Sequence, residues 1–291
     1  MKKAAVIGSP ISHSLSPRIH GFWLEQYGIE GSYDAVEVKP EHLQSFLRAL
    51  PEQGYAGVNI TLPHKEEAMR YVDEIEPLSR LLGAVNTVVV KDGKLLASNT
   101  DLGGFFENIH QHAPLFPMHG GKAVVIGAGG AARAIVMGLL IYGVPQVVIV
   151  NRTEERAGAI KQSIAAAASD GRLSRIDWEK LAEKIVIKPW AERESVLVDA
   201  NLLVNTTSLG MKNQPPLELS LKNLPITAMV TDIVYNPLET ELLKAARTRG
   251  NTVVDGLGML LHQAVPGFEA WFGVKPEVTE KLRIHVLNGY I

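Results

Sequence analysis

Small residues with the spacing of a phosphate-binding turn stand at Gly127, Gly129 and Ala132, within the segment KAVVIGAGGAARAIVMGLL. A β-branched run precedes the turn and an alanine- and leucine-rich run follows it, so the order is strand, turn, helix. In such a unit the first glycine allows the tight turn, the second lets a pyrophosphate approach the backbone, and the helix N-terminus faces the phosphates. Glycine-rich turns are common, but this flanking order favours dinucleotide binding over a purely structural turn.

The residues after the second strand of this unit indicate which dinucleotide is bound. An NAD-binding unit usually has an acidic residue there, which holds the ribose 2′-hydroxyl. This sequence has Asn151, Arg152 and Thr153 instead, with Arg156 one turn further on. The arginines could be solvated charges, but a helix N-terminus disfavours cations unless an anion binds there. Two guanidinium groups can pair with a 2′-phosphate, so we expect NADP to be preferred over NAD by about tenfold or more.

Polar side chains also gather in the first hundred residues, in the strings GSPISHSLSPRIH (8–20), NITLPHK (59–65), GAVNT (83–87) and NTDLGGF (99–105). Each string adjoins an apolar run where a strand meets a loop, which is the edge where α/β sheets bind ligands. Taken singly, Lys65 could be a surface lysine and Asp101 a helix N-cap. Ser14 and Ser16 could serve only the turn around Pro17.

Taken together and in order, these strings resemble the shikimate dehydrogenase family, which includes shikimate and quinate dehydrogenases. The resemblance runs from Met1 to the last thirty residues, and beyond the glycine turn it includes NRTEER at 151, NTTSLGM at 205, DIVYNP at 232 and DGLGMLLHQA at 255. It implies an NADP-dependent oxidoreductase that reversibly reduces 3-dehydroshikimate to shikimate, a step of aromatic amino acid (chorismate) biosynthesis. The sequence departs from the family pattern at Gly21, Ala97 and Leu102, which puts local backbone geometry and fine substrate preference in doubt.

The resemblance also implies roles for individual residues. Lys65 matches the catalytic general acid/base, acting with Asp101, and Ser14 and Ser16 match the serines that bind the substrate carboxylate. The remaining substrate-binding positions match Asn59, Thr61, Asn86, Asp101, Tyr235 and Gln263. The cofactor-binding positions match Gly127, Ala128, Gly129, Gly130, Ala131, Asn151, Arg152, Thr153, Arg156, Ile233, Gly256 and Met259.

Those catalytic roles are chemically consistent with a ketone reduction. Adding a hydride to a ketone creates an alkoxide, so a proton donor must lie within hydrogen-bond reach of that oxygen. An aspartate beside a lysine favours the ammonium form, which suits Lys65 to donate the proton. The same effect weakens Lys65 as a base for alcohol oxidation.

Histidines and tryptophans are given no catalytic role. His13, His64 and His262 lie in or beside the strings, but no close-spaced metal-ligand set is present, so we expect packing or hydrogen bonding and no metal. The tryptophans are scattered along the chain and are expected to serve packing; they are Trp23, Trp178, Trp190 and Trp271.

Short strands alternating with helices would position these residues. In the first part we expect strands over 4–7, 33–38, 57–61 and 84–90, helices over 17–27, 41–50 and 64–72, a hairpin turn at Asp92-Gly93 and a helix from Asp101 toward His110. After a linker between Pro114 and Gly121, we expect strands over 122–126, 146–150, 202–205, 228–233 and 252–254 and helices over 131–142, 154–168 and 239–249. No element is assigned within residues 172–198.

This alternation predicts two α/β domains with a cleft between them. Residues 1–104 would form the substrate domain, completed by C-terminal helices in 258–291 that bring Gln263 into the site. Residues 105–257 would form a Rossmann-type NADP domain with a doubly wound, mostly parallel sheet.

Composition limits the class of protein. The 291 residues, 46% of them hydrophobic, suffice for a large core, and the formal net charge of -2 gives no field that recruits nucleic acid or membrane. Without cysteine there is no thiolate chemistry. The uncharged run 134–150 could suggest a membrane span, but Gly143 and Pro145 interrupt it, so a buried helix followed by a buried strand is expected instead. The apolar stretch at the start of the sequence is too short for a secretory signal. We expect a cytoplasmic protein, monomer or homodimer, with small-molecule partners.

Two other functions remain open at this level. A quinate or dual quinate/shikimate dehydrogenase would share most of the strings, and Arg152 and Arg156 argue only against an NAD-preferring one. A non-catalytic NADP-binding sensor could use the same scaffold, but it would need neither Lys65 nor Asp101.

Overall fold

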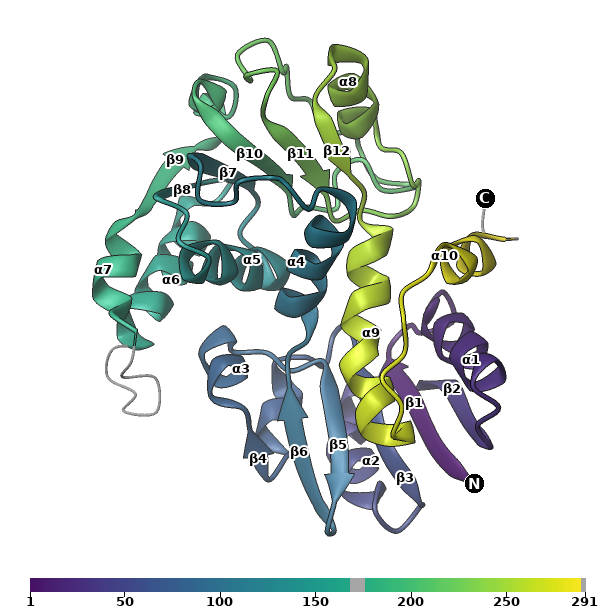
Figure 1. Cartoon of the computed structure of the whole chain (residues 1–291). Coiled ribbons are helices and arrows are strands. Elements are labelled where there is room, and N and C mark those ends of the chain that lie inside the picture. Colours follow the sequence, from purple (N-terminus) through teal and green to yellow (C-terminus); the bar gives the residue numbers. More distant parts are fainter. Residues whose placement is uncertain (168–175, 289–291) are drawn as a thin grey trace. The chain divides into compact units, whose positions relative to one another are not determined.

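The computed structural model describes residues 1–167 and 176–288, which form two compact units (Figure 1). Unit 1 comprises Met1–Gly104 and Leu260–Ile291, and unit 2 comprises Phe105–Met259. The chain passes between the units within α4 (Asp101–His112) and again within α9 (Leu257–Phe272). Each unit contains a six-stranded sheet with helices packed on it, so the prediction of two α/β domains is confirmed.

The sheet of unit 1 has the strand order β2-β1-β3-β5-β6-β4. Its strands are β1 (Lys2–Gly8), β2 (Gly31–Glu37), β3 (Tyr55–Ile60), β4 (Glu74–Ile75), β5 (Thr87–Lys91) and β6 (Lys94–Ser98). Strand β1 runs parallel to β2 and β3, whereas β5 runs antiparallel to both β3 and β6. The carboxyl ends of β1, β3 and β6 therefore meet the start of β5 at one edge of the sheet.

Helices cover both faces of this sheet. They are α1 (Ser16–Gln26), α2 (Leu43–Ala49), α3 (Pro77–Leu82) and α10 (Glu280–Leu287), with 3₁₀ turns η1 (Pro40–His42) and η2 (Glu67–Arg70). On one face, Leu43 and Leu47 of α2 join a core cluster with Ile7 of β1. On the other, Trp23 of α1 packs against Phe268 of α9 at 5.3 Å between ring centroids. Burial on both faces explains why β1 and β3 carry nearly continuous apolar runs.

The helix expected over 64–72 is wrong, because only the short turn η2 forms there. In a helix the Lys65 carbonyl would accept a bond from residue 69, but here it accepts the Val85 amide at 2.9 Å. The ring of His64 likewise has a tertiary hydrogen-bond partner, since its Nε2 lies 2.6 Å from the Val38 carbonyl. These tertiary bonds hold residues 61–66 in turns between β3 and η2.

The sheet of unit 2 has the strand order β12-β11-β10-β7-β8-β9, and every neighbouring pair is parallel. Its strands are β7 (Lys122–Ile126), β8 (Gln146–Asn151), β9 (Ile185–Pro189), β10 (Ala200–Asn205), β11 (Met229–Asp232) and β12 (Thr252–Val254). Counted within the unit, this is the doubly wound order of dinucleotide-binding sheets. The order reverses beside β7, where Ile126 is in register with Val150 on one side and Asn205 on the other. The residues after these strands therefore share one edge.

The helices of unit 2 are α5 (Gly130–Ile141), α6 (Glu154–Ala166), α7 (Trp178–Glu183) and α8 (Glu241–Arg249), with 3₁₀ turns η5 (Trp190–Glu192) and η6 (Ser195–Leu197). Helices α5 and α6 lie along the same side of the sheet (Figure 1). Helix α8 packs on a separate core cluster through Leu242 and Leu243. It begins at Thr240, whose Oγ1 accepts the Leu243 amide, and ends at Gly250 with φ +93°.

The segment left unassigned in the sequence contains α7, β9 and two 3₁₀ turns. Asp177 caps α7 by accepting the Lys180 amide at 3.0 Å, which is a helix-start signal that the charged composition conceals. Residues 172–175, and the last residue of the helix expected over 154–168, lie outside the described residues. Among residues 1–167 and 176–288, no helix has the length and hydropathy needed to cross a membrane.

Candidate active site

The polar strings of unit 1 converge on one edge of its sheet. Ser14 and Ser16 follow β1, Thr61 follows β3, Asn86 directly precedes β5, and Asp101 comes three residues after the end of β6. The register explains the convergence, since Ile7 pairs with Ile60, Asn59 with Thr87, and Thr87 with Ser98. Because β5 is antiparallel, it brings its first residues to the edge where β1, β3 and β6 end.

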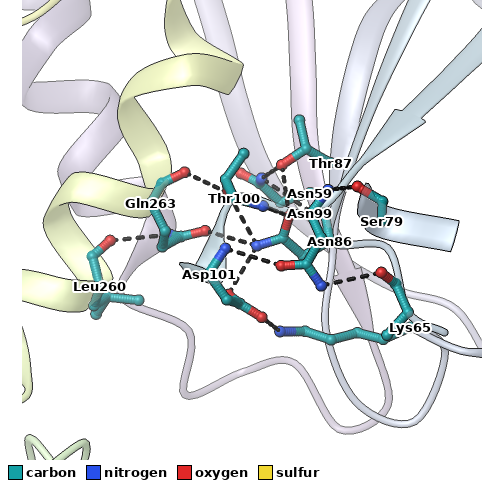
Figure 2. Close-up of polar contacts among 11 residues, drawn as sticks. Asn59, Lys65, Ser79, Asn86, Thr87, Asn99, Thr100, Asp101, Leu260 and Gln263 are labelled. Carbon is teal, nitrogen blue, oxygen red and sulfur yellow. Dashed lines mark hydrogen bonds and ion pairs between the residues drawn. The ribbon is translucent and has the colours of Figure 1, made fainter. Parts of the chain in front are cut away.

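Lys65 and Asp101 form an ion pair at this edge, with Nζ 2.6 Å from Oδ2 (Figure 2). Their side chains are 28% and 16% exposed, so the pair is partly shielded yet reachable by a ligand. The backbone N–H of Asp101 donates to Asn99 Oδ1 at 3.0 Å. The Asn99 side chain thus shapes the turn that leads into α4, and the Asp101 carboxylate is left to bind Lys65 and Asn86.

Asn86 fixes the orientation of that carboxylate. Its Nδ2 donates to Asp101 Oδ1 at 2.8 Å and to Thr100 Oγ1 at 3.0 Å, while its Oδ1 accepts the Thr100 backbone N–H at 2.9 Å (Figure 2). The two carboxylate oxygens therefore have separate partners, the amide on Oδ1 and the ammonium on Oδ2. A network satisfied in this way leaves little freedom for the carboxylate to rotate.

Gln263 comes to the same cluster from α9, more than 150 residues further along the chain. Its backbone carbonyl accepts the Thr100 hydroxyl at 2.8 Å, and its side-chain Oε1 lies 3.4 Å from Asn86 Nδ2. Its Nε2 donates to the Leu260 carbonyl at 2.9 Å. The structure thus brings Lys65, Asp101, Asn86 and Gln263 together (Figure 2).

Asn59 lies beneath this cluster and is 5% exposed. Its Oδ1 accepts the Tyr33 hydroxyl at 2.6 Å, and its Nδ2 donates to the Asn86 carbonyl at 3.2 Å and to Thr87 Oγ1 at 3.1 Å. These bonds engage both ends of the amide, so Asn59 supports Asn86 from below. A direct contact between Asn59 and substrate stays a prediction.

The serines and Thr61 share the edge without a bond to the ion pair. Ser14 Oγ accepts the Ser16 backbone N–H at 3.3 Å, and Thr61 N–H donates to the Ile7 carbonyl at 2.9 Å. Burial raises the pKa of Tyr33, and a hydrogen bond with Ser16 opposes this rise. Ser16 is therefore linked through Tyr33 to the amides under the cluster.

His20 is a buried residue of this unit that sequence reasoning missed. Its ring stacks on Tyr33 with centroids 3.8 Å apart, and burial lowers its pKa to about 3. It is therefore neutral at physiological pH and packs as an aromatic ring. His64 serves hydrogen bonding, as expected, because its Nε2 lies 2.6 Å from the Val38 carbonyl. No group of three or more potential ligands that could hold a metal occurs among the described residues.

The glycine turn of unit 2 has the geometry that a phosphate requires. Gly127 has φ +111°, and a Cβ there would lie 2.5 Å from Thr206 Oγ1, so only glycine fits. Around Gly129 and Gly130 no atom lies within 4 Å of the Cβ position, which leaves the backbone open to a ligand. No side chain caps the N-terminus of α5, so its N–H groups remain available to an anion.

The basic residues after β8 are exposed. Asn151 Nδ2 donates to the Thr153 carbonyl at 2.7 Å, which shapes the turn into α6. In the described part of the chain, neither Arg152 nor Arg156 pairs with an acidic side chain, and both are exposed. Two cations beside an open glycine turn fit a nucleotide that carries a further phosphate. These groups therefore fit NADP.

The remaining residues predicted to bind the cofactor lie at or after the ends of β11 and β12. Ile233 N–H donates to the Asn205 carbonyl at 3.1 Å, and a Cβ on Gly256 would lie 2.4 Å from the Ile233 carbonyl oxygen. Gly256 thus packs directly on the Ile233 backbone. Met259 is half-buried in the first turn of α9. Tyr235 is half-buried in the loop after β11 and belongs to unit 2.

Asp232, at the end of β11, was also missed in the sequence. It is fully buried and accepts three hydrogen bonds, from Asn205 Nδ2 at 3.0 Å, Thr240 Oγ1 at 2.8 Å and the Val234 N–H at 3.0 Å. Burial raises its pKa to about 6, and the three hydrogen bonds oppose the rise. The signal was present, since an aspartate ends an otherwise apolar run before YNP. Asp232 joins the loops after β10 and β11 at the edge where the glycine turn lies.

A parallel doubly wound sheet with an open glycine turn, joined in one chain to a unit bearing a Lys–Asp pair, is typical of dinucleotide-dependent oxidoreductases. Comparison with known proteins identifies the family. Residues 6–88 match the shikimate dehydrogenase substrate binding domain, 110–206 the shikimate / quinate 5-dehydrogenase domain, and 256–280 the shikimate 5'-dehydrogenase C-terminal domain. The chain belongs to the shikimate dehydrogenase family.

Individual relatives cover the whole chain. A protein of Paramagnetospirillum magneticum named shikimate dehydrogenase (NADP(+)) is 54% identical over 98% of each chain. The solved shikimate 5-dehydrogenase of Thermus thermophilus, in complex with NADP(H) and shikimate, is 34% identical over 99% of each chain, with a TM-score of 0.82. The quinate dehydrogenase of Corynebacterium glutamicum in complex with NAD is 30% identical over 99% of this chain and 100% of that one, with a TM-score of 0.87.

Proposed function

We propose that this protein is an NADP-dependent shikimate dehydrogenase, which reversibly reduces 3-dehydroshikimate to shikimate in aromatic amino acid biosynthesis. The observation that carries the proposal is the 54% identity, over nearly the whole length of both chains, with a shikimate dehydrogenase (NADP(+)). The Lys65–Asp101 pair supports it chemically, because it supplies the proton that a ketone reduction needs.

Lys65 is the proposed general acid. When bound, NADPH supplies the hydride that reduces the ketone carbon. Lys65 Nζ donates a proton to the developing alkoxide, and in the reverse direction it accepts the proton from the alcohol. Its side chain is 28% exposed and its Nζ lies 2.6 Å from Asp101, so the ammonium is oriented and still accessible.

Asp101 and Asn86 position that proton donor. Asp101 Oδ2 holds the ammonium while the Asn86 amide holds Oδ1, which fixes the direction from which Lys65 donates. We assign Asp101 a further bond to a substrate hydroxyl, since a carboxylate oxygen can accept more than one hydrogen bond.

The substrate carboxylate is assigned to the hydroxyls of Ser14 and Ser16, which follow β1 at the same edge. Further substrate contacts are assigned to Asn59, Thr61, Asn86, Tyr235 and Gln263. Hydroxyl and amide side chains suit a polyhydroxylated acid, because each can donate and accept.

The cofactor is assigned to unit 2. The backbone from Gly127 to Ala131 would hold the pyrophosphate at the α5 N-terminus, and Arg152 and Arg156 would bind the 2′-phosphate with Asn151 and Thr153. Ile233, Gly256 and Met259, gathered at the ends of β11 and β12, would border the nicotinamide half.

The test is reduction of 3-dehydroshikimate with NADPH. The rate is measured as consumption of NADPH, and the product is identified chemically. Formation of shikimate supports the proposal. Conversion of 3-dehydroquinate to quinate with equal efficiency would instead indicate a dual-specificity enzyme. Binding of NADPH without turnover of either ketone would indicate a sensor.

A further inference from the structure

Trp190 differs from the other tryptophans of the chain. Trp23, Trp178 and Trp271 are at most 1% exposed, whereas Trp190 is half-buried. It begins η5, directly after Pro189, the last residue of β9, and Pro189 is in register with Asn151 of β8. The indole is therefore carried to the sheet edge where the residues assigned to the 2′-phosphate begin.

Two guanidinium groups lie over this indole. The Cζ atoms of Arg152 and Arg193 are each 5.2 Å from the ring centroid. Arg193 is tethered, since its Nε donates to the Glu218 carbonyl at 3.0 Å and its Nη1 to the Trp190 carbonyl at 3.2 Å. Arg193 thus holds Trp190 in place by both its ring and its backbone.

Arg152 has no such tether. In residues 1–167 and 176–288 its guanidinium has neither an ion pair nor a hydrogen bond, and the contact with Trp190 is the interaction that restrains it. A free arginine side chain has many rotamers, and part of this rotamer entropy is lost when it binds a ligand. Stacking uses the face of the guanidinium and leaves its N–H edge free for a phosphate.

We infer that Trp190 is a specificity-determining positioning residue, which holds Arg152 ready for the 2′-phosphate and so favours NADP over NAD. The inference rests on the proposed use of NADP and extends it to a residue outside the 151–156 string. It assigns the indole no contact with the cofactor itself, because its effect passes through Arg152.

Trp190 also packs against the apolar core of unit 2. The variants must therefore distinguish the effect of its aromatic face on Arg152 from the effect of its volume on packing. Trp190→Leu keeps an apolar side chain and removes the aromatic face. Trp190→Phe keeps a face on which a guanidinium can stack. The probes are adenosine 2′,5′-bisphosphate, which carries the extra phosphate, and 5′-AMP, which lacks it; calorimetry on the full chain gives Kd for both without turnover.

We expect Trp190→Leu to weaken binding of the bisphosphate about fivefold, equivalent to about 1 kcal/mol, and to leave 5′-AMP unchanged. Trp190→Phe should keep at least half of the wild-type affinity. In an Arg152→Ala background, Trp190→Leu should have no further effect, since the two residues would act as one unit.

Four results would overturn the inference. Equal losses for the Leu and Phe variants would mean that the indole serves packing, and equal losses for both probes would mean that it touches the adenosine half. A full fivefold loss in the Arg152→Ala background would mean that it does not act through Arg152. If the wild-type chain itself binds both probes equally, the NADP preference fails first and the role of Trp190 with it.

Discussion

Replacing Lys65 by methionine tests the proposed proton donor. Methionine keeps much of the length and volume of the lysine stem but removes the ammonium that lies 2.6 Å from Asp101 Oδ2. General acid catalysis contributes about 10²–10⁴ in rate, so kcat should fall by that factor, equivalent to about 3–5 kcal/mol of transition-state stabilisation.

The structure predicts that this loss is not an effect of unfolding. The two side chains are 28% and 16% exposed, and ion pairs that remain accessible to solvent contribute about 0–1 kcal/mol to stability. In the variant, Asp101 Oδ1 would still accept the Asn86 amide at 2.8 Å. The free energy of unfolding should therefore change by about 1 kcal/mol or less, against a typical total of about 5–15 kcal/mol.

The assay is steady-state reduction of 3-dehydroshikimate, with NADPH affinity measured separately by calorimetry. Affinity for NADPH should be nearly intact, because the residues assigned to the cofactor lie elsewhere in the chain. Lys65→Arg is the matched control, since arginine keeps the positive charge beside Asp101 but does not release a proton. It should be nearly as slow as Lys65→Met. Near-normal turnover in the methionine variant would refute the proton-donor role, and near-normal turnover in Lys65→Arg alone would reduce it to a charge effect.

Three further changes probe unit 2. Arg152→Ala should weaken NADP about tenfold or more while changing NAD little, and equal losses in titrations of both would show that the arginine does not read the 2′-phosphate. Gly129→Ala should leave the free energy of unfolding within about 0.5 kcal/mol of wild type, since its Cβ would meet no atom within 4 Å, but should weaken NADP by about tenfold if pyrophosphate packs there. Burial raises the pKa of Asp232 from an ordinary 3.8 to about 6. Between pH 3.8 and about pH 6 the folded chain therefore keeps a proton that the unfolded chain releases, so the free energy of unfolding falls as pH rises through this range. Relative to Asp232→Asn, wild type should lose about 2–3 kcal/mol between pH 4 and pH 7 in urea unfolding, and parallel pH profiles would contradict the burial argument.

Most strands and helices of both units could be predicted because their signals are local, whereas no strand was assigned at the positions of β4, β6 and β9. The run 122–126 and the helix that follows the glycine turn carry β-branched and small apolar patterns that the structure reproduces in β7 and α5. The helix expected over 64–72 failed because its polar backbone groups have tertiary partners, such as the Val85 amide on the Lys65 carbonyl. Periodicity does not reveal a competing partner twenty residues away.

The residues of the polar cluster in unit 1 could be predicted from the sequence, but most of the hydrogen bonds between them could not. That Lys65 and Asp101 come together depends on β5 running antiparallel between β3 and β6, a topology that no single string encodes. The hydrogen bonds from Tyr33 to Asn59 and from Asn59 to the Asn86 carbonyl could not be predicted from the sequence either. Trp190 was expected to serve packing alone, and its contact with Arg152 depends on the pairing of β8 with β9, which was not assigned in the sequence.

The most direct test of the central claim is steady-state NADPH or NADH production by the wild-type chain with shikimate and with quinate, each tried with NADP and with NAD. We expect shikimate with NADP to have the highest kcat/KM of the four, and replacing NADP by NAD to lower it about tenfold or more. A higher value for quinate with NAD, or no activity in any of the four combinations, would contradict the proposed function.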